Sequence, residues 1–478
     1  MKWRFKKYII RLVFNLRIGA DILKRTEMNL TEGNLFKKIV IYSLPVIFTN
    51  LLQLFYTAAD LIVCGMFGSA HSTAAITSTD ALVKLIINLF MGLSIGANVL
   101  MARSYGQMDK EKGHKVMYTS MLASVVIGIV VGIFGYFMSG EMLKAMGSTS
   151  EVIDLSTRYL QIYFIGLPFL MIYNFGASLL RATGDTFRPF LILMLSGIFN
   201  IIFNLIFVIV FKMDVPGVAL ATIISEALSA IAIVVCLMRN KGFISLDLRH
   251  AKFHMREALE ILKIGLPAGI QGSLFSVSNV IIQSSINSLG TAIVGGNGAA
   301  NSLEGFIFTA MNSVSLSCVA FVSANYGAGK KENIKKSLIY CLILTTGLSL
   351  FMGGMMILFE DPLLSLYIHT PAEMEAAKLR LNMLALLYVI CGVMDCVPYA
   401  IRGIGYSVTP MIISLIGACG FRIIWIYTVF MDPRYHNLTG LLVSYPITWA
   451  ITAIVHVIIF IFLYRRLDLT KKAMDINI

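Results

Sequence analysis

Charge is scarce in this sequence. Only 14% of its 478 residues are Asp, Glu, Lys or Arg, whereas 57% are hydrophobic and the mean hydropathy is +0.80. A soluble protein of this length would need a more charged surface. Apolar runs of about 20 residues recur between bunched charges, which indicates a polytopic membrane protein. Each run must form a helix, because lipid cannot hydrogen-bond the backbone.

Motifs of enzymes and metal proteins are also absent. No P-loop, GxSxG or HExxH sequence occurs, so ATP-driven transport by this chain and hydrolysis both lack support. We expect neither an enzyme nor a cofactor. The seven cysteines are odd in number, fall in apolar runs and lack metal-ligand spacing, so we interpret them as buried free thiols. They are Cys64, Cys236, Cys318, Cys341, Cys391, Cys396 and Cys419.

The hydropathy pattern predicts an all-α protein with twelve transmembrane helices. Twelve spans place both termini on one side of the membrane. By our count, that side carries 31 of the 39 Lys and Arg residues, so both termini are predicted to be cytoplasmic. The net charge of +13 is then a topology signal that suits membrane lipids and not nucleic acid. The predicted spans are 39–64, 80–102, 117–138, 156–180, 189–211, 217–238, 261–286, 302–325, 337–359, 380–401, 410–431 and 439–463.

The first 27 residues are basic, aromatic and too charged to span a bilayer. They lack the uninterrupted apolar region of a signal peptide. One interpretation is an amphipathic helix at the membrane interface. The other is that translation starts at Met28, which mass spectrometry of the native N-terminus would decide.

The chain contains an internal repeat with an offset of about 221 residues. Six spans per copy is an even number, so the repeat is parallel and predicts two six-helix bundles related by a pseudo-twofold axis. Two facing bundles form a central cleft of the kind used for alternating access. The matched segments are SLP at Pro45 with GLP at Pro267, 102–115 with 323–336, and 179–189 with 400–410. The predicted parts are a basic cytoplasmic segment (1–35), an N-lobe (36–240), a linker (241–260), a C-lobe (261–464) and a tail (465–478).

Several segments resemble the MATE (multidrug and toxic compound extrusion) family, in its bacterial DinF-like branch. They include LPVIFTNLLQLFYTAADLIVCGMFG, NLFMGLSIGANVLMARSYG, NFGASLLRATGDTFRP and ANYGAGKKE. The resemblance implies a monomeric efflux antiporter of the bacterial plasma membrane. It would export organic cations and amphipathic drugs in exchange for H⁺ or Na⁺. The alternatives are a lipid-linked precursor flippase, which would have a more cationic cleft, and a polytopic receptor without transport.

Asp60 is the first candidate site residue, because an ionisable group inside a span is costly and usually functional. The alternative is an acid that caps an interface near the outer end of the span. The resemblance implies a cation site formed with Asn200, Asn204 and Thr222, but the family has Asp where this chain has Asn204. Loss of that carboxylate weakens the case for Na⁺. Glu226 lies four residues after Thr222 on the same helical face. It either pairs with a nearby polar group for structure alone or acts with Asp60, because two neighbouring carboxylates suit proton coupling.

Other polar residues in the spans leave alternatives open. Lys84 either reaches the outer headgroups, with Asp80 as competitor, or pairs with Asp60. Asp395 and Arg422 are predicted to form a structural ion pair, although Asp395 or Glu304 could instead attract a substrate cation. Asp395 aligns with Asn174 in the repeat, so the two lobes are predicted to differ chemically.

Overall fold

The computed structural model describes residues 27–69, 71–147, 151–368 and 370–469 and is helical throughout its spans. Predictions about residues 1–26 therefore lie outside the described residues. The first-half helices are α3 (Leu35–Phe67), α4 (Ser72–Gln107), α5 (Lys110–Ala145), α6 (Ile153–Ala182), α7 (Phe187–Leu205) with η1 (Ile206–Val210), and α8 (Asp214–Arg239). The second-half helices are α9 (Met255–Asn287), α10 (Thr291–Gly327), α11 (Lys331–Leu358), α12 (Glu360–Leu364), α13 (Pro371–Leu384), α14 (Tyr388–Gly403), α15 (Val408–Ser414), η2 (Leu415–Gly420), α16 (Phe421–Trp425), η3 (Ile426–Phe430), α17 (Leu438–Leu442) and α18 (Ser444–Arg466).

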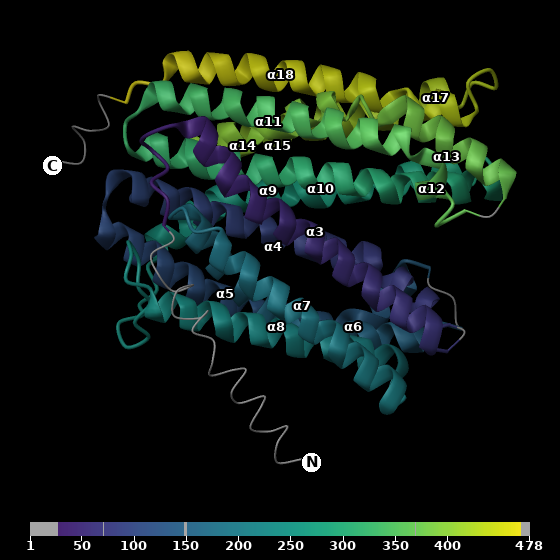
Figure 1. Cartoon of the computed structure of the whole chain (residues 1–478), viewed down its shortest axis with the longest axis horizontal. Coiled ribbons are helices and arrows are strands. Elements are labelled where there is room, and N and C mark those ends of the chain that lie inside the picture. The colour runs from purple at the N-terminus through teal and green to yellow at the C-terminus, as the bar shows by residue number, and fades with distance from the viewer. Residues whose placement is uncertain (1–26, 70, 148–150, 369, 470–478) are drawn as a thin grey trace.

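Two helical bundles make up the molecule, one from each half of the sequence. Figure 1 shows α4–α8 in blue to teal as one bundle and α9–α18 in green to yellow as the other, with α3 lying obliquely beside them. Within the described residues, eleven helices are long and apolar enough to span a membrane, and a bent pair brings the number to twelve. The prediction of twelve spans is confirmed with this bent span included.

The bent span corrects the prediction for 380–401. It consists of α13 and α14, and the chain bends by 55° between these two helices. Arg380 lies inside α13, and its side chain is only 3% exposed. A buried arginine needs acidic and polar partners, which the fold supplies from α10.

Apolar side chains cover the outer surface, as expected of helices that face lipid. On α5, the exposed residues include Val130 (60%) and Phe137 (74%), while Gly128, Gly132 and Gly135 pack against α6. All seven cysteines are free and buried, which confirms the interpretation of them as free thiols.

The two lobes approach most closely through small residues. A Cβ atom added to Gly92 of α4 would lie 2.0 Å from the backbone nitrogen of Gly269 in α9. Toward the end of α4, a Cβ on Gly106 would lie 1.9 Å from the carbonyl oxygen of Ala324 in α10. Only glycine permits such backbone contact, so the lobes are packed tightly at the end where α4 and α10 finish.

Both ends of the described chain lie at this packed end. Asn325 Nδ2 donates to the carbonyl oxygen of Leu30, and Lys331 Nζ donates to that of Leu467. The two ends of the described chain therefore share one face of the protein, as an even number of spans requires.

Candidate functional site

Asp60 lies in a polar cluster formed by three helices of the N-lobe. Asn204 of α7 donates from Nδ2 to Asp60 Oδ1 at 2.5 Å, and Thr222 of α8 donates from Oγ1 to Asp60 Oδ2 at 3.5 Å. Asn200 Nδ2 in turn donates to Thr222 Oγ1 at 3.4 Å. The spacing of Asn200 and Asn204 places both amides on one helical face toward α3. The structure thus brings together four of the residues singled out from the sequence.

The arrangement of the amides bears on whether this cluster can hold Na⁺. Asn204 directs its NH₂ group toward Asp60 and toward Asn200 Oδ1, at 2.5 and 3.2 Å. A donor group therefore stands between two oxygens that a sodium ion would need as ligands. The buried Oδ1 of Asn204 has no hydrogen-bond partner in the described structure. As arranged, the residues do not fit a sodium ion.

Glu226 adds a second carboxylate beside this cluster. It lies on α8 one turn after Thr222, and its charge is close enough to interact with that of Asp60. Within the described residues, no hydrogen bond or ion pair holds the Glu226 carboxylate, in contrast to that of Asp60. Two carboxylates near each other in a low-dielectric region repel, so the cluster responds strongly to the arrival of one positive charge.

The C-lobe contains a cavity of about 480 Å³. Its walls come from α9, α10, α13, α14, α16 and α18, and one wall comes from α4 of the N-lobe. The charged residues that line it are Arg380, Arg402, Arg422 and Asp395. Three guanidinium groups thus face the cavity with one carboxylate. A cavity of this volume falls in the range of small-molecule sites.

One of these arginines is part of a buried ion pair. Arg380 donates from Nε and Nη2 to the two carboxylate oxygens of Glu304, at 3.0 and 2.7 Å. Arg380 also donates to Asn297 Oδ1 at 2.6 Å and to Asn301 Oδ1 at 3.1 Å, and Tyr388 donates to Glu304 at 3.0 Å. Glu304 is fully buried behind Arg380 and does not line the cavity. This geometry favours a structural framework and does not leave Glu304 free to attract a cation.

The predicted ion pair between Asp395 and Arg422 is wrong. Asp395 Oδ2 accepts a hydrogen bond from Asn312 Nδ2 at 3.1 Å, and its charge attracts Arg402. Arg422 instead donates to Thr448 Oγ1 at 3.3 Å and lies 4.3 Å above the centroid of the Tyr445 ring. Asp395 and Arg422 come from different helices, α14 and α16. Their spacing in the sequence could not show that α10 supplies the hydrogen-bond donor to Asp395 and that α18 supplies the partners of Arg422.

Lys84 and Asn174 lie outside both polar sites. Lys84 Nζ contacts Asp80 Oδ2 at 2.6 Å on the exposed surface of α4, so the structure pairs it with Asp80 and not with Asp60. Asn174 donates to the carbonyl oxygen of Leu170 in its own helix and lines a small cavity of about 20 Å³ beside Arg181. Neither residue contacts the cluster around Asp60.

Sequence reasoning missed Arg380 and Arg402 as cavity residues. Arg402 had a signal, because it matches Arg181 in the repeated segments LLRATGDTFRP and AIRGIGYSVTP. In the structure Arg402 Nη2 donates to Gln271 Oε1 at 2.5 Å, and its guanidinium lies 4.9 Å from the centroid of Tyr399. Gln271 lies on α9, so this contact depends on tertiary packing.

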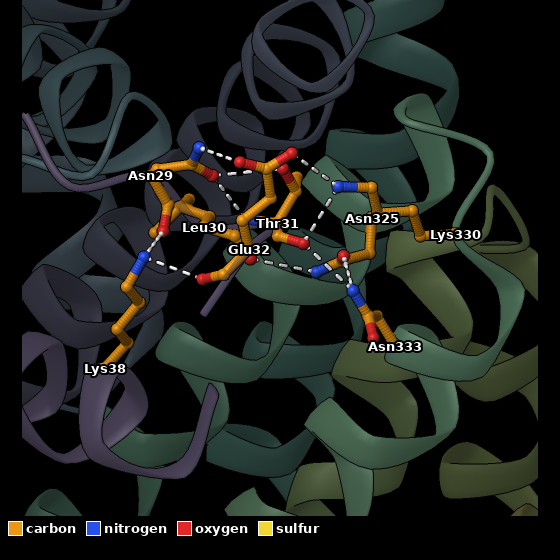
Figure 2. A network of polar contacts seen from close by, with 8 residues as sticks. All are labelled: Asn29, Leu30, Thr31, Glu32, Lys38, Asn325, Lys330 and Asn333. Atoms are coloured by element: carbon orange, nitrogen blue, oxygen red, sulfur yellow. Dashed lines mark hydrogen bonds and ion pairs between the residues drawn. The ribbon is translucent and has the colours of Figure 1, made fainter. Parts of the chain in front are cut away.

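The chain just before α3 links the two lobes at their packed end. We call residues 27–33 the terminal strap. Glu27 accepts from Asn240 Nδ2 at 3.2 Å at the end of α8 and from Phe243 N at 3.0 Å in the connection that follows, so this part of the strap is held by the N-lobe. Farther along, Figure 2 shows that Leu30, Thr31 and Glu32 contact Asn325, Lys330 and Asn333 of the C-lobe. Leu30 is fully buried.

Two helical bundles, a buried polar cluster in one and a cavity in the other define a two-lobed membrane transporter. The chain belongs to the MatE family, which it matches twice, over residues 45–206 and 267–428. The two matches begin at Pro45 and Pro267, so they confirm the internal repeat. The chain is therefore a multi-pass transporter and not an enzyme.

Comparisons with known proteins agree on this family. The chain is 23% identical over 92% of its length to the probable multidrug resistance protein YoeA of Bacillus subtilis, of which 96% is covered. It is 24% identical over 93% of its length to the multidrug export protein MepA of Staphylococcus aureus, of which 97% is covered.

Solved structures share the fold. A MOP superfamily transporter from Pyrococcus furiosus, described as having reverse polarity of its binding pocket, has a TM-score of 0.86 at 22% identity, with 91% and 97% of the two chains covered. A multidrug resistance MATE transporter in an outward-facing conformation has a TM-score of 0.84 at 22% identity, with 92% and 98% covered.

Proposed function

We propose that this chain is a secondary active exporter of amphipathic small molecules in exchange for protons, with Asp60 as the coupling group. The observation that carries the proposal is the cluster in which Asp60 is held by α7 and α8 within the membrane-spanning N-lobe. The names of the relatives support small-molecule export. We further propose that the protein acts as a monomer in the bacterial plasma membrane and contacts anionic lipids through its basic face.

Protonation would change the hydrogen bonds around Asp60. An ionised carboxylate only accepts, whereas a protonated one also donates. The unpartnered Oδ1 of Asn204 can accept that hydrogen bond once its amide rotates. The contact between α3 and α7 therefore has two arrangements, one for each charge state of Asp60. A proton shifts the conformation only through its different affinity for the two states.

Helix α3 connects this cluster to the interface between the lobes. It carries Asp60 and also reaches α10 of the C-lobe, where Asn50 Nδ2 donates to Ser313 Oγ at 2.9 Å. Nearer to Asp60, the rings of Phe55 and Phe306 have their centroids 5.6 Å apart. A shift of α3 against α7 would therefore disturb the packing between the lobes, which alternating access requires.

The positions of the charges support a cytoplasmic location for the packed end. The two ends of the described chain and the connections rich in Lys and Arg lie there, and positive residues remain on the cytoplasmic side. In the described conformation the terminal strap then closes the cytoplasmic end. Export would require the strap contacts to Asn325 and Asn333 to break once per cycle.

The experiment is transport into and out of proteoliposomes under an imposed pH or sodium gradient. The probes are ethidium, a cation, and 11-(dansylamino)undecanoate, an anion. We expect a pH gradient to drive uphill movement of at least one probe, and Asp60→Asn to abolish it. Asp80→Asn, which removes an exposed carboxylate from α4, is the matched control and should retain transport. Movement driven only by sodium would contradict proton coupling.

A lipid-linked precursor flippase remains the second candidate, favoured by the three arginines in the cavity. A flippase of this kind should move a fluorescent polyprenyl-phosphate analogue across the bilayer of a proteoliposome. If that analogue moved and both small probes did not, the second candidate would replace the first.

A further inference from the structure

The charges of the C-lobe cavity do not balance. Glu304 is matched to Arg380 by two hydrogen bonds, and Asp395 is the remaining carboxylate for Arg402 and Arg422. Guanidinium groups stay protonated in proteins, so the resulting excess of one positive charge is permanent. An uncompensated charge at membrane depth is costly and usually marks a functional site.

Arg422 carries most of this excess. Its side chain is only 3% exposed, and within the described structure no carboxylate pairs with it. It has a neutral hydroxyl, Thr448 Oγ1, at 3.3 Å and the face of Tyr445 at 4.3 Å, and its Nε has no hydrogen-bond partner. Arg402 also has an unpartnered Nε and is equally buried. Two buried guanidinium groups thus line the same cavity, each with an Nε donor that has no hydrogen-bond partner.

The remaining walls of the cavity combine apolar and neutral polar groups. Phe275, Phe308, Ile282 and Trp449 provide apolar surface. A ligand for this site therefore needs an anionic group for the arginines and an apolar body for these side chains.

We propose that the C-lobe cavity binds the carboxylate or phosphate group of an anionic amphiphile, with Arg422 as its principal ligand and Arg402 beside it. The inference rests on the proposed transport function and specifies the charge of its substrate. It departs from the organic cations that the family resemblance implies. Arg380 is not assigned to the anion, because its Nε and Nη2 already donate to the carboxylate of Glu304.

Equilibrium binding to the purified full-length protein in neutral detergent tests the proposal without any ion gradient. The probes are 11-(dansylamino)undecanoate, its uncharged methyl ester and the amine with the same dansyl group and chain length. We expect the acid to bind at least about tenfold more tightly than the ester or the amine, because a charge-assisted hydrogen bond contributes that much. Equal affinities for all three probes would overturn the proposal.

Variants of Arg422 locate the site. Arg422→Gln should weaken binding of the acid about tenfold or more and leave the ester within about twofold, whereas Arg422→Lys should retain most of the difference. The matched control is Arg434→Gln, at an exposed arginine outside the cavity. If Arg422→Gln fails to fold, Arg402→Gln and the comparison of acid with ester on the wild type decide the question. Unchanged acid binding in both glutamine variants would place the anion elsewhere and overturn the proposal.

Two further measurements complete the test. One separates lipid phosphates from free organic acids as the source of the anion, and the other separates a failure of binding from a failure of transport. Displacement of the dansyl acid by dihexanoyl phosphatidic acid, and not by dihexanoyl phosphatidylcholine, would assign the site to lipid phosphates as well as free organic acids. Displacement by neither would restrict the anion to non-lipid acids. Arg422-dependent binding without gradient-driven movement would contradict the transport proposal and leave the binding site standing.

Discussion

The two lobes share a fold and differ in the chemistry of their buried charges. The N-lobe has a carboxylate held by amides and a hydroxyl, with a second carboxylate, Glu226, nearby. The C-lobe has three arginines around a cavity, one of them neutralised by Glu304. Carboxylates can exchange protons, whereas guanidinium groups keep their charge. This chemistry suits the N-lobe to ion coupling and the C-lobe to binding a ligand of fixed charge.

The largest expected effect concerns the framework of the C-lobe. Arg380→Met should destabilise the protein by about 3–5 kcal/mol, because it leaves Glu304 buried without its cation. The double variant Arg380→Met with Glu304→Gln should recover a large part of that loss. Thermal unfolding in detergent measures both. A single variant as stable as the wild type would show that the pair is not a structural element.

A second substitution tests whether the amide group of Asn204 keeps sodium out of the cluster around Asp60. Asn204→Asp removes the donor that faces Asp60 and adds a second oxygen ligand. We expect sodium to stabilise this variant by about 1–2 kcal/mol at roughly ten to thirty times its dissociation constant. Thermal unfolding in sodium and in choline chloride provides the measurement. Equal sodium stabilisation of the wild type would mean that Asn204 turns its oxygen toward the ion.

A smaller effect is expected at the terminal strap. Asn333→Ala removes the hydrogen bonds from Nδ2 to the Thr31 carbonyl and to Asn325 Oδ1, both at 3.0 Å. Of these two bonds, the one to the Thr31 carbonyl joins the strap to the C-lobe. Its loss is worth about 1 kcal/mol, so the open population of this end should rise roughly fivefold. Spin labels at positions 110 and 336, on different lobes, would report longer distances by pulsed dipolar spectroscopy. Lys335→Ala, on the exposed side of α11, is the control and should leave the distances unchanged.

The smallest effects are expected at the exposed ion pairs. The Lys330 ammonium lowers the pKa of Glu32, so this carboxylate stays ionised at neutral pH. Its stabilising contact is present at neutral pH and is lost only as the pH falls through that lowered pKa. Glu32→Gln should therefore leave the pH dependence of transport between about pH 6 and 8 unchanged. Lys84→Met should also leave it unchanged, since Lys84 pairs with Asp80. A shifted pH profile in the Lys84 variant would instead support an ion pair between Lys84 and Asp60.

Much of the fold could be predicted from hydropathy and the repeat. Some predicted spans are shorter than the observed helices, because these helices continue beyond the apolar run into more polar sequence. Helix α10 begins at Thr291 and not near 302, because its Gly-rich first turns pack against α13, where a Cβ on Gly296 would lie 2.2 Å from the carbonyl oxygen of Glu373. The bend between α13 and α14 falls at Ala385, Leu386 and Leu387, where the sequence has no proline or glycine that would predict it.

The two sites differ in how far the sequence could reveal them. Asn200 with Asn204, and Thr222 with Glu226, are separated by one helical turn, so their shared faces follow from local geometry. The C-lobe contacts join residues such as Gln271 and Arg402, which are far apart in sequence. Sequence spacing cannot supply such pairs, and it gave Arg422 the wrong partner.

The division of roles between the lobes is tested most directly by measuring binding and uphill transport side by side. The samples are the wild type, Asp60→Asn and Arg422→Gln, with 11-(dansylamino)undecanoate as probe and a pH gradient as driving force. We expect Asp60→Asn to bind the probe within about twofold of the wild type while losing uphill transport. Arg422→Gln should lose binding by about tenfold or more, and its transport should fall with binding. Loss of binding in Asp60→Asn together with normal binding in Arg422→Gln would contradict the account.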